Sequence, residues 1–246
     1  QTLSADPSQP ASASKGSRED TIEVLYGTAF TSRQINEALR SDRPLDIVPS
    51  IDAEGHGTFM AGIAAGGQSP SGDFIGAAPK AAIGMVKLKP AKKYLRDFFL
   101  IQEDASAYQE NDIMMGIKYL RVEAFSQRKP LVILLGIGSN LGSHEGTSPL
   151  NVMIQDISRN LGMATVIAAG NETGRGHHYM GSVPIGEESV EVEIRVGNAE
   201  SQRGFVVELW AATADTYSVG FVSPSGESIG RIPIIGRNET SIGFLL

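Results

Sequence analysis

A histidine between two glycines opens a run of small and apolar residues, GHGTFMAGIAAG, at positions 55–66. The imidazole of histidine titrates near neutral pH, so it can take up and release a proton during a reaction. Gly55 and Gly57 carry no side chains beside His56, so another segment of the chain can approach it closely. The small residues that follow predict a helix that packs tightly under a sheet. His56 then lies in the first turn of that helix, facing a cleft at the ends of the strands.

An asparagine with a second possible chemical role follows an apolar run further along the chain. Residues 164–174, ATVIAAGNETG, are typical of a buried strand that leads into Asn171. An amide side chain at a strand end can donate a hydrogen bond to an oxygen on which negative charge develops when a carbonyl group is attacked. Asn171 is alternatively a turn residue, and it begins an Asn-Glu-Thr glycosylation sequon.

Three continuous apolar runs predict the strands that would position these side chains. They cover residues 81–88, 131–137 and 164–169, and such runs are typical of strands buried on both faces. Helical patterns lie between them, and this alternation implies a parallel sheet with right-handed crossovers. The sequence therefore predicts an α/β core with a site at the carboxyl ends of its strands.

Two of the intervening helices have recognisable ends and apolar faces. The first is expected to be capped by Asn111 or Asp112. Its buried face is expected to comprise Ile113, Ile117, Leu120 and Ala124. The second is expected to have Ser148 as its N-cap, Pro149 at its first position and Gly162 as its C-cap. Its apolar stripe is expected to comprise Ile154, Ile157 and Leu161.

After about residue 182 the pattern changes to short segments with a period of two. Apolar and charged residues alternate over residues 190–196, VEVEIRV, and further apolar segments follow with turn residues between them. This pattern predicts an antiparallel β module. The chain is thus expected to divide into an exposed loop region at 1–20, a partial α/β core at 21–181 and a partial β-rich domain at 182–246.

The motif GHGTxxAG around His56 resembles the histidine motif of the subtilisin-like serine proteases. Residues 164–174 resemble the oxyanion segment of the same family. The resemblance implies that His56 takes the proton from a nucleophilic serine as a general base. It also implies that Asn171 is the side chain that stabilises the oxyanion.

A third segment of the family lies between these two motifs, where a strand borders the cleft and pairs with the extended substrate. In this sequence that place is held by Gly136, Ile137 and Gly138. The glycines leave room for substrate side chains, and the backbone groups supply the pairing. The family more often has a serine where Gly136 stands. The resemblance therefore implies a polypeptide substrate aligned by these three residues.

The resemblance extends to one branch of the family, the clostridial germination proteases of the Csp type. Residues 86–101, 108–120 and 142–151 resemble that branch, and the order of the segments also matches. In that branch a jelly-roll insertion follows the oxyanion asparagine and precedes the serine, and residues 190–227 resemble its first half. The fold implied is a subtilisin-like parallel sheet flanked by helices, then an antiparallel, jelly-roll-like insertion, both incomplete.

An aspartate and a serine that such a peptidase requires have no counterparts at the expected places. No Asp-Ser-Gly or Asp-Thr-Gly triplet occurs, and Asp52 is too near His56 in the sequence, so a structural role is expected for it. Ser148 ends a Gly-Thr-Ser triplet, but it precedes Asn171, whereas the family's serine follows the asparagine. We expect the aspartate and the serine outside these residues, which would then be an internal fragment without peptidase activity.

A pseudoprotease is the main alternative to an active parent protein. Some proteins of the Csp type keep the fold but lose triad residues and act in signalling or as scaffolds. The presence of His56 and Asn171 favours an active parent. Secretion or association with spores is implied only through the family branch, and the oligomeric state is not indicated.

Two other kinds of site are weaker interpretations of the sequence. Residues 136–142, GIGSNLG, resemble a glycine-rich phosphate loop, but the glycine spacing differs and no helix is predicted to begin within them. A metal site would have to use His144, Glu145, His177 and His178. Adjacent histidines do not easily share one metal, and no H-E-x-x-H motif occurs.

The composition is that of an ordinary globular protein, with 246 residues of which 41% are hydrophobic and 20% charged. The net charge of −7 argues against nucleic-acid binding, which needs a basic surface. No apolar run reaches the roughly 18–20 residues that span a bilayer, so no membrane partner is expected. The sequence has no cysteine, which excludes disulfides, and no cofactor is expected.

Overall fold

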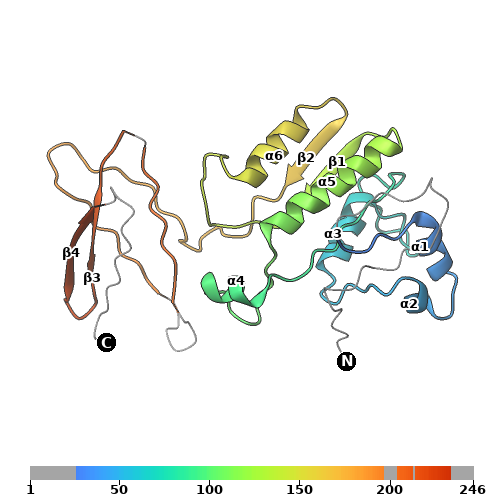
Figure 1. Ribbon diagram of the computed structural model, residues 1–246, viewed down its shortest axis with the longest axis horizontal. Helices are drawn as coiled ribbons and strands as arrows, with labels where there is room; N and C mark the ends of the chain where they lie inside the picture. Colours follow the sequence, from blue (N-terminus) through green and yellow to red (C-terminus); the bar gives the residue numbers. More distant parts are fainter. Residues whose placement is uncertain (1–25, 197–203, 213, 234–246) are drawn as a thin grey trace. The chain divides into compact units, whose positions relative to one another are not determined.

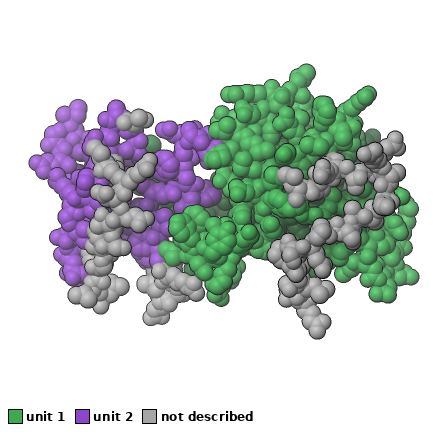
Figure 2. Space-filling model, viewed as in Figure 1, with its two compact units in different colours: residues 1–138, 149–180 green, residues 139–148, 181–246 purple. Residues whose placement is uncertain are grey.

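The computed structural model describes residues 26–196, 204–212 and 214–233. The chain forms two compact units, which Figure 2 colours separately. Unit 1 comprises residues 1–138 and 149–180, and unit 2 comprises residues 139–148 and 181–246. The predicted loop region at 1–20 lies outside the described residues, as do the parts of the predicted β-rich domain at 197–203 and 234–246. Within the described ranges, no helix has both the length and the apolar character needed to cross a membrane.

Unit 1 has helices around a small parallel sheet (Figure 1). Its described helices are α1 (Ser32–Ala38), α2 (Pro44–Ile47), α3 (His56–Ala65), α4 (Lys93–Phe98), α5 (Glu110–Ser126) and α6 (Pro149–Ser158). Its described strands are β1 (Leu131–Leu135) and β2 (Met163–Ile167). These strands confirm the two predicted over 131–137 and 164–169, and the mixed α/β character is confirmed with them.

β1 and β2 are parallel, and helix α6 lies in the crossover between them. The register pairs Leu131 with Met163 and Leu135 with Ile167. Because parallel strands run in the same direction, the chain leaves both of them at the same edge of the sheet. Gly136 and Asn171, which follow the two strands, are therefore attached to the same edge.

The core of unit 1 lies between this sheet and helices α5 and α6. Ile117 of α5, Ile133 of β1 and Ile157 of α6 are buried and pack together. The partly buried residues around them are Ile113, Leu131, Leu135, Leu150, Met153, Ile154 and Met163. Burial of one isoleucine side chain contributes about 1.5–3 kcal/mol to folding. These contacts therefore hold α5 and α6 on one face of the sheet.

Helix α5 begins earlier than predicted, because Gln109 and neither Asn111 nor Asp112 is its N-cap. Asp112 is buried in the first turn, where its Oδ1 accepts a hydrogen bond from the Tyr26 hydroxyl at 2.6 Å. That hydrogen bond raises the pKa of Tyr26 to about 12. A carboxylate in the first turn also interacts favourably with the helix dipole. A tertiary contact, which no local pattern reveals, thus gives Asp112 its role.

Helix α6 begins at Pro149, directly after Ser148, as the sequence predicts. Its predicted apolar stripe is correct in part. Ile157 is buried and Ile154 packs against the core. Leu161, in contrast, lies beyond the end of the helix and is fully exposed. The helix is shorter than the apolar pattern, and a polar side chain bonds to its last carbonyl groups.

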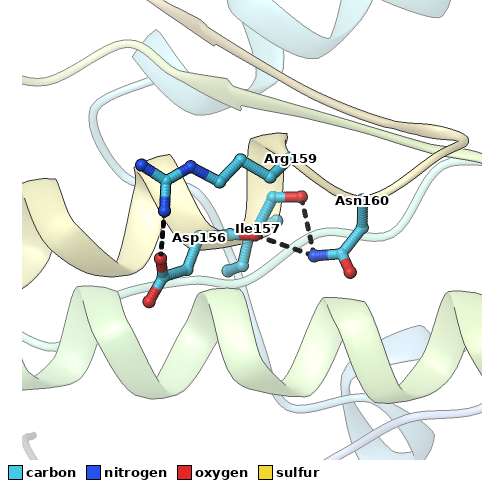
Figure 3. A network of polar contacts seen from close by, with 4 residues as sticks. All are labelled: Asp156, Ile157, Arg159 and Asn160. Atoms are coloured by element: carbon cyan, nitrogen blue, oxygen red, sulfur yellow. Dashed lines mark hydrogen bonds and ion pairs between the residues drawn. The ribbon is translucent and has the colours of Figure 1, made fainter.

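That side chain is Asn160, whose amide donates to the carbonyl oxygens of Asp156 at 2.8 Å and Ile157 at 3.1 Å (Figure 3). The last carbonyl groups of a helix have no partner within the helix, so this amide satisfies two of them. Gly162, predicted as the C-cap, lies further on in the turn before β2 with a φ of +80°, a region that favours glycine. Arg159 forms an exposed ion pair with Asp156 at 3.3 Å.

Replacement of Asn160 by alanine is expected to lower the free energy of unfolding by about 1 kcal/mol. The Asp156 carbonyl loses its side-chain donor, and the Ile157 carbonyl keeps only the backbone N–H of residue 160. Urea or thermal unfolding measures this loss. Arg159→Ala is the matched control in the same turn, and its exposed ion pair is expected to contribute less than about 0.5 kcal/mol. Equal destabilisation by the two variants would contradict the role of the Asn160 amide.

The predicted strand over residues 81–88 is wrong, since these residues form no strand in the structure. The segment instead lies along helix α5. A Cβ on Gly116 of the helix would be 3.0 Å from Val86 Cγ1, and one on Gly84 would be 2.9 Å from Leu120 Cδ2. The two glycines therefore permit the close approach. An apolar run predicts burial, whereas a strand also needs a hydrogen-bonding neighbour that local periodicity does not specify.

Unit 2 contains an antiparallel pair, β3 (Ser218–Val222) and β4 (Ser228–Pro233) (Figure 1). The turn between them is closed by a hydrogen bond from Ser223 N to Glu227 O at 2.8 Å. The pair confirms the antiparallel pairing predicted for this part of the chain. The strand predicted over residues 190–196 is wrong, because the segment forms no strand and its apolar side chains are exposed. Alternation assigns side chains to two faces, but it does not supply a pairing partner.

Candidate active site

His56 is the first residue of helix α3, as predicted for the first turn. Gly55 precedes it as the N-cap with a φ of +80°, a left-handed conformation that favours glycine. The imidazole is exposed, and no residue in the described part of the chain forms a hydrogen bond with it. The sequence Gly-His therefore starts a helix whose first side chain is accessible from solvent.

The start of α3 is held by the carboxylate of Asp52. Its Oδ1 accepts a hydrogen bond from Gly55 N at 2.8 Å. Its Oδ2 accepts from Thr58 N at 2.9 Å and from Thr58 Oγ1 at 2.7 Å. The hydrogen bonds from Thr58, with those from Gly55 and Glu54, hold the pKa of Asp52 at about 2. This carboxylate thus fixes the helix that carries His56, and its hydrogen bonds go to neighbouring donors instead of the imidazole.

Asp52→Ala is expected to lower the midpoint of thermal unfolding at neutral pH, because the first turn of α3 loses its acceptor. The pKa of Asp52 is lowered on folding, so the stabilisation is present above pH 3.8 and is lost as the pH falls through about 2. The midpoints of thermal unfolding of Asp52→Ala and of the unsubstituted chain, measured from pH 7 downward, should therefore converge at low pH. Asp46→Ala, which removes an exposed ion pair with Arg43, is the control. A constant difference at every pH would contradict this prediction.

Gly136 brings the end of β1 against the first turns of α3. A Cβ added to Gly136 would be 3.6 Å from His56 Cε1 and 3.1 Å from Met60 Cε. Side chains alternate between the faces of a strand, so Gly136 faces away from Ile133 and the α5–α6 layer. Helix α3 therefore meets the sheet edge on the other face. Sequence reasoning missed Met60, although its position one turn after His56 is a signal that it shares the same face.

The other two predicted substrate residues continue from Gly136. Ile137 is half-buried, and Gly138 is exposed, with no atom within 4 Å of the position of a Cβ. The backbone at Gly138 is therefore accessible. An extended peptide can pair with accessible backbone groups of this kind by strand addition.

Asn171 follows β2 at the same sheet edge. Ala168 N donates to Leu135 O at 3.0 Å, so the pairing continues for one residue past the end of β2. Gly170 has a φ of +89°, and the chain turns there before Asn171, which is exposed. His56 and Gly136 thus lie close together, whereas Asn171 is placed at this edge by the strand register.

A contact that the sequence did not predict joins two side chains of the loop after Asn171. His177 Nδ1 lies 2.6 Å from Glu172 Oε2, and Arg175 N donates to Glu172 O at 3.0 Å. Both side chains of the pair are about half exposed, so this contact contributes at most about 1 kcal/mol. It closes the loop directly beside Asn171. The sequence carried no signal of this pair, because polar residues in a loop do not specify which partner each will meet.

Neither the metal site nor the phosphate loop considered from the sequence has a matching geometry in the described residues. Among them, no group of three or more histidine, aspartate and glutamate side chains is arranged to hold a metal. His144 belongs to unit 2, where its Nε2 lies 3.3 Å from Asn140 O, whereas His177 belongs to unit 1. A phosphate loop leads directly into a helix N-terminus, but α6 begins at Pro149, seven residues after the last glycine of 136–142.

Comparison with known protein families matches residues 30–226 to the Subtilase family, peptidase family S8, and the chain belongs to that family. This confirms the membership predicted from the motifs around His56 and Asn171. The family is one of serine peptidases that act on polypeptides. None of the curated proteins matches the chain.

Among solved structures, the chain is similar to the CspB protease of Clostridium perfringens, in agreement with the branch that the sequence indicated. The two share 30% sequence identity with a TM-score of 0.62. The match covers 85% of this chain and 41% of the CspB chain. This chain therefore spans less than half the length of the protease that it matches.

Proposed function

We propose that this chain is part of a subtilase that hydrolyses peptide bonds by acyl transfer. The observation that carries the proposal is the approach of Gly136 to His56, with 3.6 Å between a Cβ at Gly136 and His56 Cε1. A substrate paired with the backbone at Gly136–Gly138 would have its carbonyl group beside the imidazole. Asn171, attached to the same sheet edge, would donate to the oxyanion.

The catalytic serine and aspartate of this proposal lie in sequence flanking the 246 residues, as does the remainder of the β-rich insertion. The serine hydroxyl attacks the peptide carbonyl carbon while His56 accepts its proton. The oxyanion is stabilised by the Asn171 amide, and His56 then protonates the leaving amine as the C–N bond breaks. Water releases the acyl group by the same steps, again with His56 as the base.

The test compares the 246-residue chain with the same chain extended by its flanking sequence on both sides, called the extended protein below. We expect a fluorophosphonate to label one serine of the extended protein, and casein to be hydrolysed. The chain alone should give neither result. Labelling of Ser148 in the chain alone would contradict the proposed position of the nucleophile. A folded extended protein that is neither labelled nor active would be a pseudoprotease, the alternative function.

A further inference from the structure

The loop at residues 139–148 continues without a break from the proposed substrate-aligning residues Gly136–Gly138. Gly138 is nevertheless the last residue of this part of unit 1, and the loop belongs to unit 2 together with residues 181–246 (Figure 2). The backbone that would pair with substrate is therefore covalently joined to a loop that folds with the β-rich part of the chain.

Glu208 holds this loop from a position 66 residues further along the chain. Its Oε2 accepts a hydrogen bond from Gly142 N at 2.7 Å and one from Trp210 Nε1 at 3.4 Å. Hydrogen bonds to an ionised acceptor are stronger than those between neutral groups. Gly142 has a φ of +91°, a conformation that favours glycine.

Two further hydrogen bonds of the loop join residues that are close together in the sequence. Leu141 N donates to Ser139 Oγ at 3.1 Å, and Glu145 N donates to Ser143 Oγ at 3.2 Å. Such bonds shape the loop, but they do not fix it to the rest of unit 2. The Glu208 carboxylate does so at Gly142, four residues after Gly138.

We propose that Glu208 is a positioning residue for the substrate, acting through loop 139–148 on the backbone of Gly136–Gly138. The inference rests on the proposed function, because it assumes that these three residues align a peptide. Pairing by strand addition requires a backbone held in an extended path. Release of Gly142 frees the far end of that path, and the reacting bond of a long substrate is then less well aligned with His56.

The first test uses the 246-residue chain and needs no activity. We expect Glu208→Ala to accelerate amide hydrogen exchange across residues 136–142 by about threefold or more, because Gly142 loses a charge-assisted bond. Glu208→Gln, which keeps an acceptor oxygen, should restore part of the protection. Glu193→Ala, which removes an exposed pair with Arg195 in the same unit, should leave this exchange unchanged. Equal exchange in Glu208→Ala and the unsubstituted chain would overturn the proposal.

The second test uses the extended protein with two substrates, an extended peptide and a small acetyl ester that has no backbone to pair. Glu208→Ala is expected to lower kcat/KM for the peptide about three- to tenfold and to leave that for the ester unchanged. Loss of both activities to the same extent, or of neither, would contradict the positioning role. Absence of both activities in the unsubstituted extended protein would instead contradict the proposed function. The positioning role of Glu208, which rests on that function, would then be contradicted as well.

Discussion

His56→Ala is expected to remove peptide hydrolysis by the extended protein, with kcat/KM falling by about 10³-fold or more. The nucleophilic serine keeps its proton at neutral pH unless a base accepts it. His56 is a titratable side chain beside Gly136 at the end of β1, where a Cβ on the glycine would lie 3.6 Å from His56 Cε1. The neighbouring side chain of Met60 cannot accept a proton. Steady-state kinetics with a chromogenic peptide measure the loss.

The same substitution is expected to leave the fold intact, which separates a chemical effect from a structural one. The imidazole is exposed and forms no hydrogen bond with a described residue, so the free energy of unfolding should change by less than about 0.5 kcal/mol. Asp52→Ala is the complementary control, because it should lower the stability of the start of α3 while it retains the His56 base. Unchanged turnover in a folded His56→Ala protein would refute the assignment.

Asn171→Ala is expected to lower kcat by about 10²–10³-fold with little change in KM. This range is the one known for the oxyanion-stabilising asparagine of subtilisin, a member of the same family. KM should stay nearly constant because the amide acts on a charge that exists only in the transition state. Measurement of kcat and KM separately, with one peptide, tests the split.

Two asparagine variants provide the comparison. Asn171→Asp retains the shape of the side chain but cannot donate when ionised, and its charge opposes the oxyanion, so it should be at least as inactive as the alanine variant. Asn160→Ala, the same exchange at the end of α6, should lower stability without changing kcat. A higher KM with normal kcat in Asn171→Ala would mean that the amide binds the substrate and does not stabilise the transition state.

The candidate site was predictable where it depends on short stretches of chain. The pair Gly55-His56 starts a helix because glycine alone readily adopts the required conformation, and this is a property of neighbouring residues. Asn171 follows an apolar run that forms a strand as predicted. The contact of Glu172 with His177 was not predictable, since two exposed polar residues in a loop carry no signal of the partner that each will meet.

The sequence by itself determined the family, the strands β1 and β2, the start of α6 and the location of His56 at a helix start, because each follows from residues adjacent in the chain. Only the tertiary structure decided that residues 81–88 lie along α5 and form no strand, and that Asp112 bonds to Tyr26 in place of capping its helix. It also decided that Gly142 is held by Glu208. The physical reason is that turns, caps and periodicity express short-range preferences, whereas hydrogen-bond partners distant in sequence are selected when packed elements meet.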